Sequence, residues 1–394
     1  MIDTPSIVVV NGARTAIGRY AGSLSAVDGY VLGAAAVREA ISRSGIEGAD
    51  VDEVIMGCVG QVGPDAYNAR RVSIEAGLPY GTTAFTVNRL CGSGLQAIIS
   101  GAIQLQVGAS DVVVAGGNES MSRLPWLVPD ARAGHRLGDR AIVDGTLAIL
   151  TDPWSNQPMG VTAENVAREY GVSRSAQDDY ALLSQRRTAT AISRGAFSEQ
   201  IASVSVAGRK GVTLVTEDEH PRPETTIDDL SRLRPAFADE GTVTAGNSSG
   251  INDGGAAVVL MREKDAQAQG LTPRMRLVSW AKGAMDPQLM GFAPAVAVER
   301  VLQASGMTID DIDVIELNEA FAAQVVAVMR ATGMSPDRTN PNGGAIALGH
   351  PVGATGAILT VKLAHDLADR DLQTGMVTMC IGGGQALAAV FERC

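Results

Sequence analysis

The chain has 394 residues, of which 45% are hydrophobic and 19% are charged, and its formal net charge is −11 at pH 7. This length and composition are those of a globular protein with more than one lobe. The excess of negative charge argues against a broad surface for nucleic acids or for an anionic membrane, although a local cationic pocket could hold a small anion.

The four cysteines, Cys58, Cys91, Cys380 and Cys394, show no CxxC or Cys/His spacing. We therefore expect reduced thiols, no disulfide framework and no metal site. The first residues, MIDTPSIVVVNGAR, show neither a basic leader nor a secretory hydrophobic region. No apolar run reaches the ~18 residues of a membrane span. We expect a cytoplasmic protein that binds neither nucleic acid nor membrane.

Short apolar runs alternate with helical patterns along the first part of the chain. SIVVVNGA, DEVIMGCV and DVVVAGG are typical of buried strands, whereas VLGAAAVREAIS and GLQAIISGAIQLQVG are typical of helices. This alternation predicts βαβ units, a largely parallel buried sheet and the α/β fold class.

Residues 122–248 differ in kind, because they are rich in Arg, Asp, Pro and Trp. The pattern predicts helices at AENVAREYGV and at SAQDDYALLSQRRTATAISRG, the second starting near Ser175 with a serine N-cap. TEDEHPRPETT is typical of an exposed loop. We interpret this region as an inserted lobe that covers a site built by the flanking halves.

The second half of the chain repeats patterns of the first half in the same order. Residues 45–59 correspond to 306–321, with strands expected at 54–56 and 314–317. Residues 111–117 correspond to 376–384, each run preceded by a helix of small residues, and 252–261 correspond to 383–392. The repeat predicts a duplicated fold, with halves at 1–121 plus 249–270 and at 271–394, and the inserted lobe at 122–248.

The segment TVNRLCGSGLQA places Cys91 between an apolar strand and a helix that begins about Gly92–Leu95. The positive end of a helix dipole favours thiolate over thiol, and backbone N–H groups there could hold an oxyanion. Taken alone, a cysteine at such a junction is more often an inert core residue. GSGLQA, with Asp111 downstream, also fits a GxGxxA dinucleotide fingerprint, a weak signal that leaves the cysteine unexplained.

Two further segments help to decide whether Cys91 is catalytic or an inert core residue. His350 lies between Gly349 and Pro351 in a turn before a helix, so we expect a loop to expose it rather than an apolar helix face to bury it. Cys380 ends a strand before three glycines, as a counterpart of Cys91. Core packing does not require two cysteines and a histidine, each flanked by glycine at the end of an element, and together they indicate a catalytic site.

Four segments, NRLCGSGLQ, NEAFAAQ, NPNGGAIALGHPVGATG and CIGGGQ, resemble the signature segments of the thiolase family, in the family's order. The resemblance runs almost end to end and includes MGVTAENVA and AGNSSGINDGGAA. It implies a duplicated thiolase-like fold, in which two βαβ-rich halves pack in layers with an inserted loop domain for coenzyme A binding and oligomer contacts.

The activity implied is that of an acetyl-CoA acetyltransferase or 3-ketoacyl-CoA thiolase. Such an enzyme catalyses reversible thiolytic cleavage of 3-oxoacyl-CoA and Claisen condensation of an acyl-CoA with acetyl-CoA, in fatty acid or lipid metabolism. Coenzyme A and acyl-CoA are its substrates, no bound cofactor is expected, and a homotetramer or dimer is implied.

The resemblance also assigns catalytic roles. Cys91 would be the nucleophile that carries the acyl thioester, His350 would be its base, and Cys380 would be the second acid/base, acting at the α-carbon. Asn318 would hold a water that, with His350, stabilises the thioester oxyanion. The backbone N–H groups of Cys91 and Gly382 would form a second oxyanion hole.

Substrate-binding roles follow in the same way. The resemblance places Arg222 against the adenine and Ser249 on the pantetheine arm, and it lines the acyl pocket with Met159, Met290, Ala320 and Phe321. Arg209 and Lys210 offer more positive charge but are more simply explained as a solvated loop.

The chain departs from the family pattern at two substrate-lining segments. Pro158-Met159-Gly160 stands where short-chain biosynthetic members commonly carry His-Met-Gly, and MGFAPAVA stands where MGIGPVPA is commoner, so that Ala293 replaces a glycine. Both changes put specificity for acetoacetyl-CoA in doubt and leave room for a longer, branched or aromatic 3-oxoacyl-CoA.

Three alternatives remain. A decarboxylating condensing enzyme of the β-ketoacyl synthase type shares the fold but lacks the second catalytic cysteine, so Cys380 argues against it. A non-enzymatic acyl-CoA carrier would be free to lose a catalytic group, yet all four groups are present. A dinucleotide oxidoreductase rests on GSGLQA alone.

Overall fold

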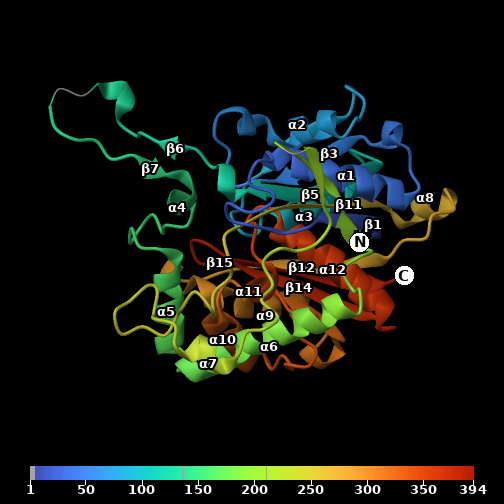
Figure 1. The fold of residues 1–394 in the computed structure, drawn as a ribbon. Coiled ribbons are helices and arrows are strands. Elements are labelled where there is room, and N and C mark those ends of the chain that lie inside the picture. Colours follow the sequence, from blue (N-terminus) through green and yellow to red (C-terminus); the bar gives the residue numbers. More distant parts are fainter. Residues whose placement is uncertain (1–4, 135–136, 210) are drawn as a thin grey trace.

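The computed structural model of the chain describes residues 5–134, 137–209 and 211–394. A mixed sheet runs through it with the strand order β13-β14-β15-β12-β1-β11-β5-β3-β4. The two halves meet where Ile7–Val9 of β1 pairs antiparallel with Met275–Leu277 of β12. Figure 1 shows the N-terminal half above and the C-terminal half below.

In the N-terminal half, β3 pairs parallel with β4 and β5, and β11 pairs antiparallel with β5 and β1. Helices α1 and α2 pack on the outer face of this sheet and α3 packs on its inner face. The strands are β1 (Ile7–Thr15), β2 (Gly18–Arg19), β3 (Glu53–Gly57), β4 (Thr83–Val87), β5 (Val112–Ser120) and β11 (Asn252–Arg262). The helices are α1 (Gly29–Ser44), α2 (Asn68–Glu75), α3 (Ser93–Gln106) and α8 (Glu263–Ala268).

The C-terminal half repeats this strand order. The run β13-β14-β15-β12 corresponds to β3-β5-β11-β1, and Thr339 forms an isolated parallel bridge to Ile315 at the position of β4. The strands are β12 (Met275–Ala284), β13 (Val314–Leu317), β14 (Thr374–Ile381) and β15 (Gln385–Arg393). The helices are α9 (Ala293–Ser305), α10 (Ala322–Thr332), α11 (Ala345–Leu348) and α12 (Thr355–Asp369). The α/β class and the layered thiolase-like fold are confirmed, whereas the boundaries given above for the three parts stay predictions.

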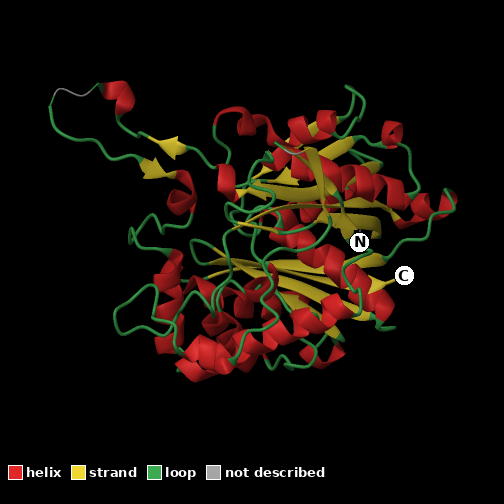
Figure 2. Ribbon diagram, in the orientation of Figure 1, coloured by secondary structure: helices red, strands yellow, loops and turns green. Residues whose placement is uncertain are grey.

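The prediction of a largely parallel sheet is wrong. A tight turn with positive φ at Gly383 and Gly384 joins β14 to β15, and such a turn can connect only antiparallel strands. In the N-terminal half, β11 returns from the inserted region and lies antiparallel between β1 and β5. The strands are nevertheless buried as predicted, because helices cover both faces (Figure 2).

Helices α3 and α12 form the middle layer of the molecule (Figures 1 and 2). Their side chains share one core with residues of both sheets, including Ile98, Val258, Ile358 and Val377. The first thirteen residues of α12, Thr355–Leu367, are all buried, which explains why this helix lacks the polar face of a surface helix.

The N-termini of these two helices are in direct backbone contact. A Cβ on Gly94 would lie 2.8 Å from the backbone N of Ala357, and a Cβ on Gly356 would overlap the backbone N of Leu95. The two glycines occupy corresponding places in the halves, so each helix makes room for the other. This contact brings the turn before α3 next to the turn before α12.

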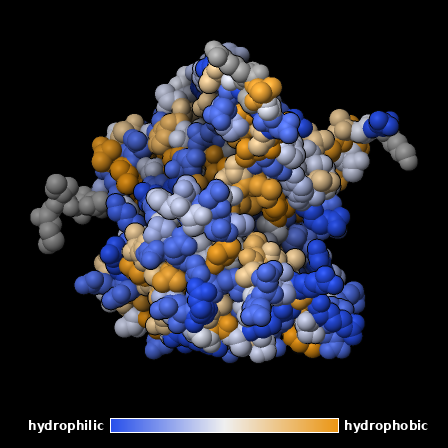
Figure 3. Space-filling view, turned by 90° about the vertical axis from the view of Figure 1, so that its left-hand side faces the viewer, coloured by the Kyte–Doolittle hydropathy of each residue, from blue (hydrophilic) through white to orange (hydrophobic). Residues whose placement is uncertain are grey.

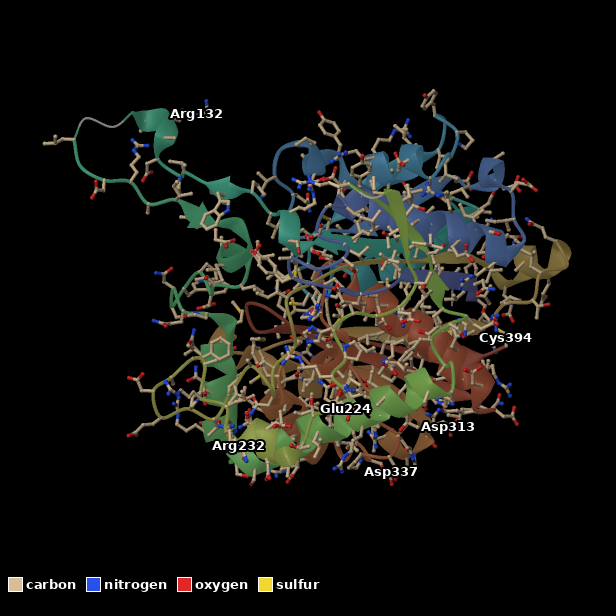
Figure 4. All side chains as sticks on the ribbon, viewed as in Figure 1. Arg132, Glu224, Arg232, Asp313, Asp337 and Cys394 are labelled. Atoms are coloured by element: carbon tan, nitrogen blue, oxygen red, sulfur yellow. The ribbon has the colours of Figure 1, made fainter. Side chains whose placement is uncertain are left out.

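In its described residues the inserted region forms four α-helices, two strand pairs and the short strand β8, which pairs with β1. The arm, which contains β6 and β7, projects from the body, with Arg132 near its far end (Figures 1 and 4). Helices α5 and α6 pack on α10 of the C-terminal half. The elements are β6 (Trp126–Leu127), β7 (Val143–Asp144), α4 (Gly145–Ile149), α5 (Met159–Glu169), α6 (Arg174–Ser193), β8 (Ile201–Ala202), β9 (Val204–Gly208), β10 (Gly211–Val215) and α7 (Ile227–Ser231).

Two local predictions in this region need correction. Helix α6 begins at Arg174, one residue before the predicted start, and its N-cap is Ser173, whose hydroxyl accepts from the N–H of Ala176. The segment 216–226 is not simply an exposed loop. The side chain of Asp218 is only 2% exposed and pairs with the guanidinium of Arg14 at 2.7 Å, so the segment is anchored to β1.

We expect Gly356→Ala to destabilise the protein, because its new methyl group would meet the backbone of Leu95 rather than a side chain that can move. Overpacking of this kind costs about 1–3 kcal/mol in the free energy of unfolding. Chemical denaturation monitored by circular dichroism measures the change. Gly81→Ala is the matched control, because a Cβ there would find nothing within 4 Å. Equal stability of the two variants would contradict the backbone contact described above.

Candidate active site

Cys91 lies in a strained turn between β4 and α3. The residue before it, Leu90, has φ 47, a left-handed conformation that a branched side chain rarely adopts. Ser93 holds this turn, because its hydroxyl donates to the carbonyl of Leu90 at 2.6 Å and accepts from the N–H of Arg89 at 2.9 Å. The turn thus fixes the direction in which the Cys91 side chain leaves the backbone.

The thiol of Cys91 faces a cavity of about 350 Å³ with mostly apolar walls. Figure 3 looks onto the face that carries the arm and shows hydrophobic residues gathered near its middle. The backbone N–H groups of Gly382 and of Cys91 itself lie near enough to the sulfur to favour its charged form. The walls are formed by Val59, Asn88, Leu90, Cys91, Ala148, Ile149, Leu150, Thr151, Pro153, Trp154, Met159, Val352, Gly382, Gly383 and Gln385.

Burial raises the pKa of the Cys91 thiol to about 11, although the N–H groups of Gly382 and Cys91 act in the opposite direction; the charge of Glu119 adds to the rise. The predicted lowering of this pKa is therefore wrong for the free protein. Helix α3 begins only at Ser93, beyond the thiol, and the loss of water around the sulfur outweighs the helix dipole.

His350 lies in the turn before α12, as predicted, but it is only 5% exposed, so the expectation of an exposed histidine is wrong. The turn needs glycine before it, because Gly349 has φ 108 and packs against the side chain of Asn252. The backbone N–H of His350 donates to Oδ1 of Asn252 at 2.9 Å. The histidine is therefore fixed at its backbone by a residue of β11, in the other half.

The hydrogen bonds of the ring assign its tautomer. Nδ1 of His350 lies 2.7 Å from Oγ1 of Thr355, and this hydroxyl donates its own proton to the carbonyl of Pro351 at 3.0 Å. Nδ1 must therefore carry the ring proton, so the lone pair is on Nε2, which lies 3.5 Å from Nδ2 of Asn318. Burial lowers the pKa of His350 to about 4, so the ring is neutral and Nε2 can accept a proton.

Cys380, at the end of β14, is 1% exposed. Burial raises the pKa of its thiol, and the charge of Cys91 raises it further. Cys380 shares a hydrophobic cluster with Met290, Ala320 and Phe321, and Met159 packs against that cluster. The structure thus gathers the predicted acyl-pocket residues around one of the predicted catalytic groups.

Asn318 follows β13 and is fully buried. No group in the part of the chain that the structure describes bonds to its Oδ1, an arrangement that suits a bound water. The next residue, Glu319, anchors this end of the strand, because its carboxylate accepts from the hydroxyls of Tyr180 and Ser184 and from two further donors, the Asn340 side chain and the N–H of Ile346. The inserted region therefore helps to hold Asn318 in place.

The two residues predicted to bind coenzyme A lie apart from the cavity walls. Ser249 is half-buried and its N–H donates to the carbonyl of Ala320 at 2.9 Å, so it borders the cluster around Cys380. Arg222 is exposed, and its N–H donates to Oε1 of Gln185 at 2.9 Å. Arg209 is exposed on β9–β10, as expected of a solvated loop, and Lys210 lies outside the described residues.

Sequence reasoning missed several residues that shape this site. Asn252 and Thr355 hold His350 in place, and Trp154 and Leu150 line the cavity. Thr355 stood inside the segment GHPVGATG, five residues after the histidine, but only the folded turn reveals that its hydroxyl meets the ring. Trp154 lies in the inserted region, close in sequence to Met159.

The two halves therefore bring together a partly buried thiol, a neutral imidazole, a second, buried thiol and two backbone donors. This is the kind of site that a cysteine-dependent acyltransferase requires. Residues 7–264 match the family model for the thiolase N-terminal domain, and residues 271–393 match that for the thiolase C-terminal domain. The chain belongs to the thiolase family, as the sequence predicted.

Individual relatives agree with this assignment. The chain is 51% identical to the beta-ketothiolase BktB of Cupriavidus necator, over 99% of this chain and all of that protein. It superposes on the acetyl-CoA acetyltransferase of Bacillus anthracis with a TM-score of 0.98, 40% identity and 99% coverage of both chains. Human mitochondrial 3-ketoacyl-CoA thiolase in complex with CoA gives a TM-score of 0.95, with 40% identity over 99% of this chain and 98% of that one.

The dinucleotide interpretation of GSGLQA does not fit the structure. A pyrophosphate would need the open N-terminus of α3, but the backbone of Gly353 and Ala357 lies against Gly94 there. Within the described residues, no helix is both long and apolar enough to cross a membrane.

We expect alkylation of Cys91 by iodoacetamide in the free protein to accelerate about tenfold per pH unit from about pH 7 to pH 10, because the thiolate is the nucleophile and the pKa of this thiol is raised to about 11. Peptide mass spectrometry after timed quenching measures the rate at Cys91 alone. A rate already at its plateau near neutral pH would indicate a preformed thiolate–imidazolium pair and contradict the neutral site.

Proposed function

We propose that this chain cleaves 3-oxoacyl-CoA esters with coenzyme A, and catalyses the reverse Claisen condensation, through an acyl group carried on Cys91. The observation that carries this proposal is the convergence of Cys91, His350, Asn318 and Cys380 from two halves of the chain. The names of the relatives, a beta-ketothiolase and acetyl-CoA acetyltransferases, support the reaction class.

In cleavage, Nε2 of His350 takes the proton of Cys91, and the sulfur attacks the 3-oxo carbon of the substrate. The N–H groups of Cys91 and Gly382, which already point at this sulfur, hold the oxyanion that forms. The bond between C2 and C3 then breaks and leaves the acyl group on Cys91. The enolate of the departing acetyl-CoA takes a proton on C2 from the thiol of Cys380.

The second half of the reaction restores the enzyme. The thiolate of Cys380 takes the proton of incoming coenzyme A, whose sulfur attacks the acyl-Cys91 thioester. The thiolate of Cys91 leaves and regains its proton from His350. Condensation follows the same steps in reverse, with Cys380 removing the α-proton of acetyl-CoA while His350 and a water on Asn318 stabilise the thioester enolate.

The neutral state of the site is consistent with this chemistry. Both thiols have a raised pKa and His350 has a lowered one, so proton transfer between them is unfavourable before substrate binds. Donors fixed at the two oxyanion positions offset that cost when charge develops on the substrate. The free protein therefore avoids a reactive thiolate while the cavity is open to water.

The acyl group enters the cluster of Met159, Met290, Ala320 and Phe321, and coenzyme A extends along Ser249 toward Arg222. Of the two departures from the family pattern, Pro158 is the N-cap of α5 and Ala293 is fully buried at the start of α9, so both act on the acyl pocket through the elements that line it. We propose an apolar 3-oxoacyl substrate in fatty acid or lipid metabolism.

We also propose a cytoplasmic homo-oligomer, either a dimer or a tetramer. Several large hydrophobic side chains of the inserted region are exposed, among them Trp126 at 66% and Trp154 at 69%, and a second copy of the chain would cover them. The four free cysteines are consistent with a reducing compartment.

Replacing either catalytic cysteine should separate the two half-reactions. We expect Cys91→Ala to abolish acyl-enzyme formation, and Cys380→Ser to form the acyl-enzyme from acetyl-CoA but to lose thiolysis of acetoacetyl-CoA, because the serine hydroxyl is a much weaker acid. Intact-mass measurement and the absorbance of acetoacetyl-CoA report the two steps. Cys394→Ser is the control, since Cys394 lies at the edge of the molecule opposite the arm (Figure 4). An acyl mass on a peptide without Cys91 would sink the scheme.

The role of Thr355 can be tested by an isosteric change. Thr355→Val removes the oxygen that accepts from Nδ1 of His350, so the ring can turn or change tautomer, and we expect kcat to fall by about 100-fold. Thr360→Val is the matched control, because Thr360 is also buried in α12 and its hydroxyl donates to the carbonyl four residues earlier, but it does not touch the histidine. Equal kcat values for the two variants would show that Thr355 does not orient the base.

A further inference from the structure

A buried carboxylate that the mechanism above does not use lies where the two halves meet. Glu119, on β5, is 2% exposed. Among the described residues, its partners are backbone N–H groups rather than a cation: Oε2 accepts from Val59 at 2.9 Å and from Gly353 at 3.0 Å, and Oε1 accepts from Gly60 at 3.0 Å. The thiol of Cys58 lies 3.9 Å from Oε1.

These donors belong to two segments of the active site. Val59 and Gly60 follow β3 in the N-terminal half, and Val59 lines the cavity at Cys91. Gly353 belongs to the turn that carries His350 in the C-terminal half, and its neighbour Val352 lines the same cavity. The carboxylate of Glu119 therefore joins the cavity wall at Cys91 to the turn that carries His350.

The fit around Gly353 leaves no room for this turn to move. A Cβ on Gly57 would lie 2.8 Å from the carbonyl oxygen of Gly353, and a Cβ on Gly117 would overlap that oxygen. The N–H of the same residue points at Glu119. Both backbone polar groups of Gly353 thus face strands β3 and β5 of the opposite half.

The number of donors around Glu119 explains why a charged side chain stands at this place. A buried carboxylate without a cation is costly, and a neutral side chain would be the cheaper choice if only one donor had to be satisfied. Three converging N–H groups, however, need two acceptor oxygens. A glutamine would offer one oxygen and would turn its NH₂ toward a backbone N–H.

We propose that Glu119 is a positioning residue, whose carboxylate locks the His350 turn against the Val59–Gly60 segment and so sets the base in line with the thiol of Cys91. This inference rests on the proposed function and names a further residue on which that reaction depends.

The charge of Glu119 supplies a second signature. Burial raises the pKa of Glu119 to about 7, the N–H groups of Val59, Gly60 and Gly353 oppose this rise, and the charge of Asp65 adds to it. The ionised carboxylate in turn contributes to the raised pKa of Cys91. Removing the charge of Glu119 should therefore make Cys91 easier to ionise. The same change should leave His350 out of position.

The test compares Glu119→Gln with the unaltered enzyme. We expect kcat for thiolysis of acetoacetyl-CoA to fall by about 100-fold, as for a misplaced catalytic group, while KM for coenzyme A stays nearly unchanged because its binding residues are untouched. The pH curve for alkylation of Cys91 by iodoacetamide should move to lower pH. Activity falls although the thiol ionises more readily, a pair of effects that loss of packing alone does not produce.

Asp313→Asn is the matched control. Asp313 accepts from the backbone N–H groups of Gln373 and Thr374 at 3.0 Å and 2.9 Å, so this change also removes a carboxylate that holds backbone donors. It lies at the lower edge of the C-terminal half, away from the arm (Figure 4). We expect it to lower the melting temperature and to leave kcat and the alkylation curve unchanged.

If Glu119→Gln does not fold, Glu119→Asp takes its place: the charge remains but the shorter side chain cannot reach both segments, so kcat should fall with the alkylation curve unmoved. A folded variant with kcat within about threefold of the unaltered enzyme overturns the positioning role, as does a loss of kcat matched by Asp313→Asn. Absence of thiolysis in the unaltered enzyme, with acetoacetyl-CoA and with longer 3-oxoacyl-CoA esters alike, would instead overturn the proposed function.

Discussion

The contact between the N-termini of α3 and α12 governs the geometry of this protein. Gly94 and Gly356 let two helix backbones touch where side chains would normally keep them apart. Because Cys91 and His350 stand in the turns that enter these helices, the contact brings the turn of the predicted nucleophile next to the turn of the predicted base. The duplicated fold supplies two equivalent helices, and their junction supplies the site.

Burial sets the electrostatics of the site. The helix dipole and the N–H groups near Cys91 favour a thiolate, but the loss of water around the sulfur is the larger effect. The same effect keeps His350 neutral. Two buried carboxylates near the site, Glu119 and Glu319, hold backbone and side-chain donors in place. Burial thus leaves both Cys91 and His350 uncharged in the free protein.

Much of this could be read from the sequence, because glycine-flanked Cys91, His350 and Cys380 mark element ends that local patterns reveal. The strands at 54–56 and 314–317 were found for the same reason. The direction of the strands could not be read from the sequence, since a buried apolar run such as 252–261 looks the same in a parallel and an antiparallel sheet. The shifted pKa of Cys91 and the bond from His350 to Thr355 were also beyond reach, because both depend on which segments enclose a side chain in space.

The left-handed backbone at Leu90 lowers the stability of the folded chain but holds the thiol of Cys91 in position. A residue that relaxes there would lower the energy of the folded chain, yet it would free the thiol of Cys91 to swing away from Gly382. Selection for a more heat-resistant enzyme would favour glycine at this position, and selection for turnover would oppose it. At this turn, a more stable protein would be an enzyme with slower turnover.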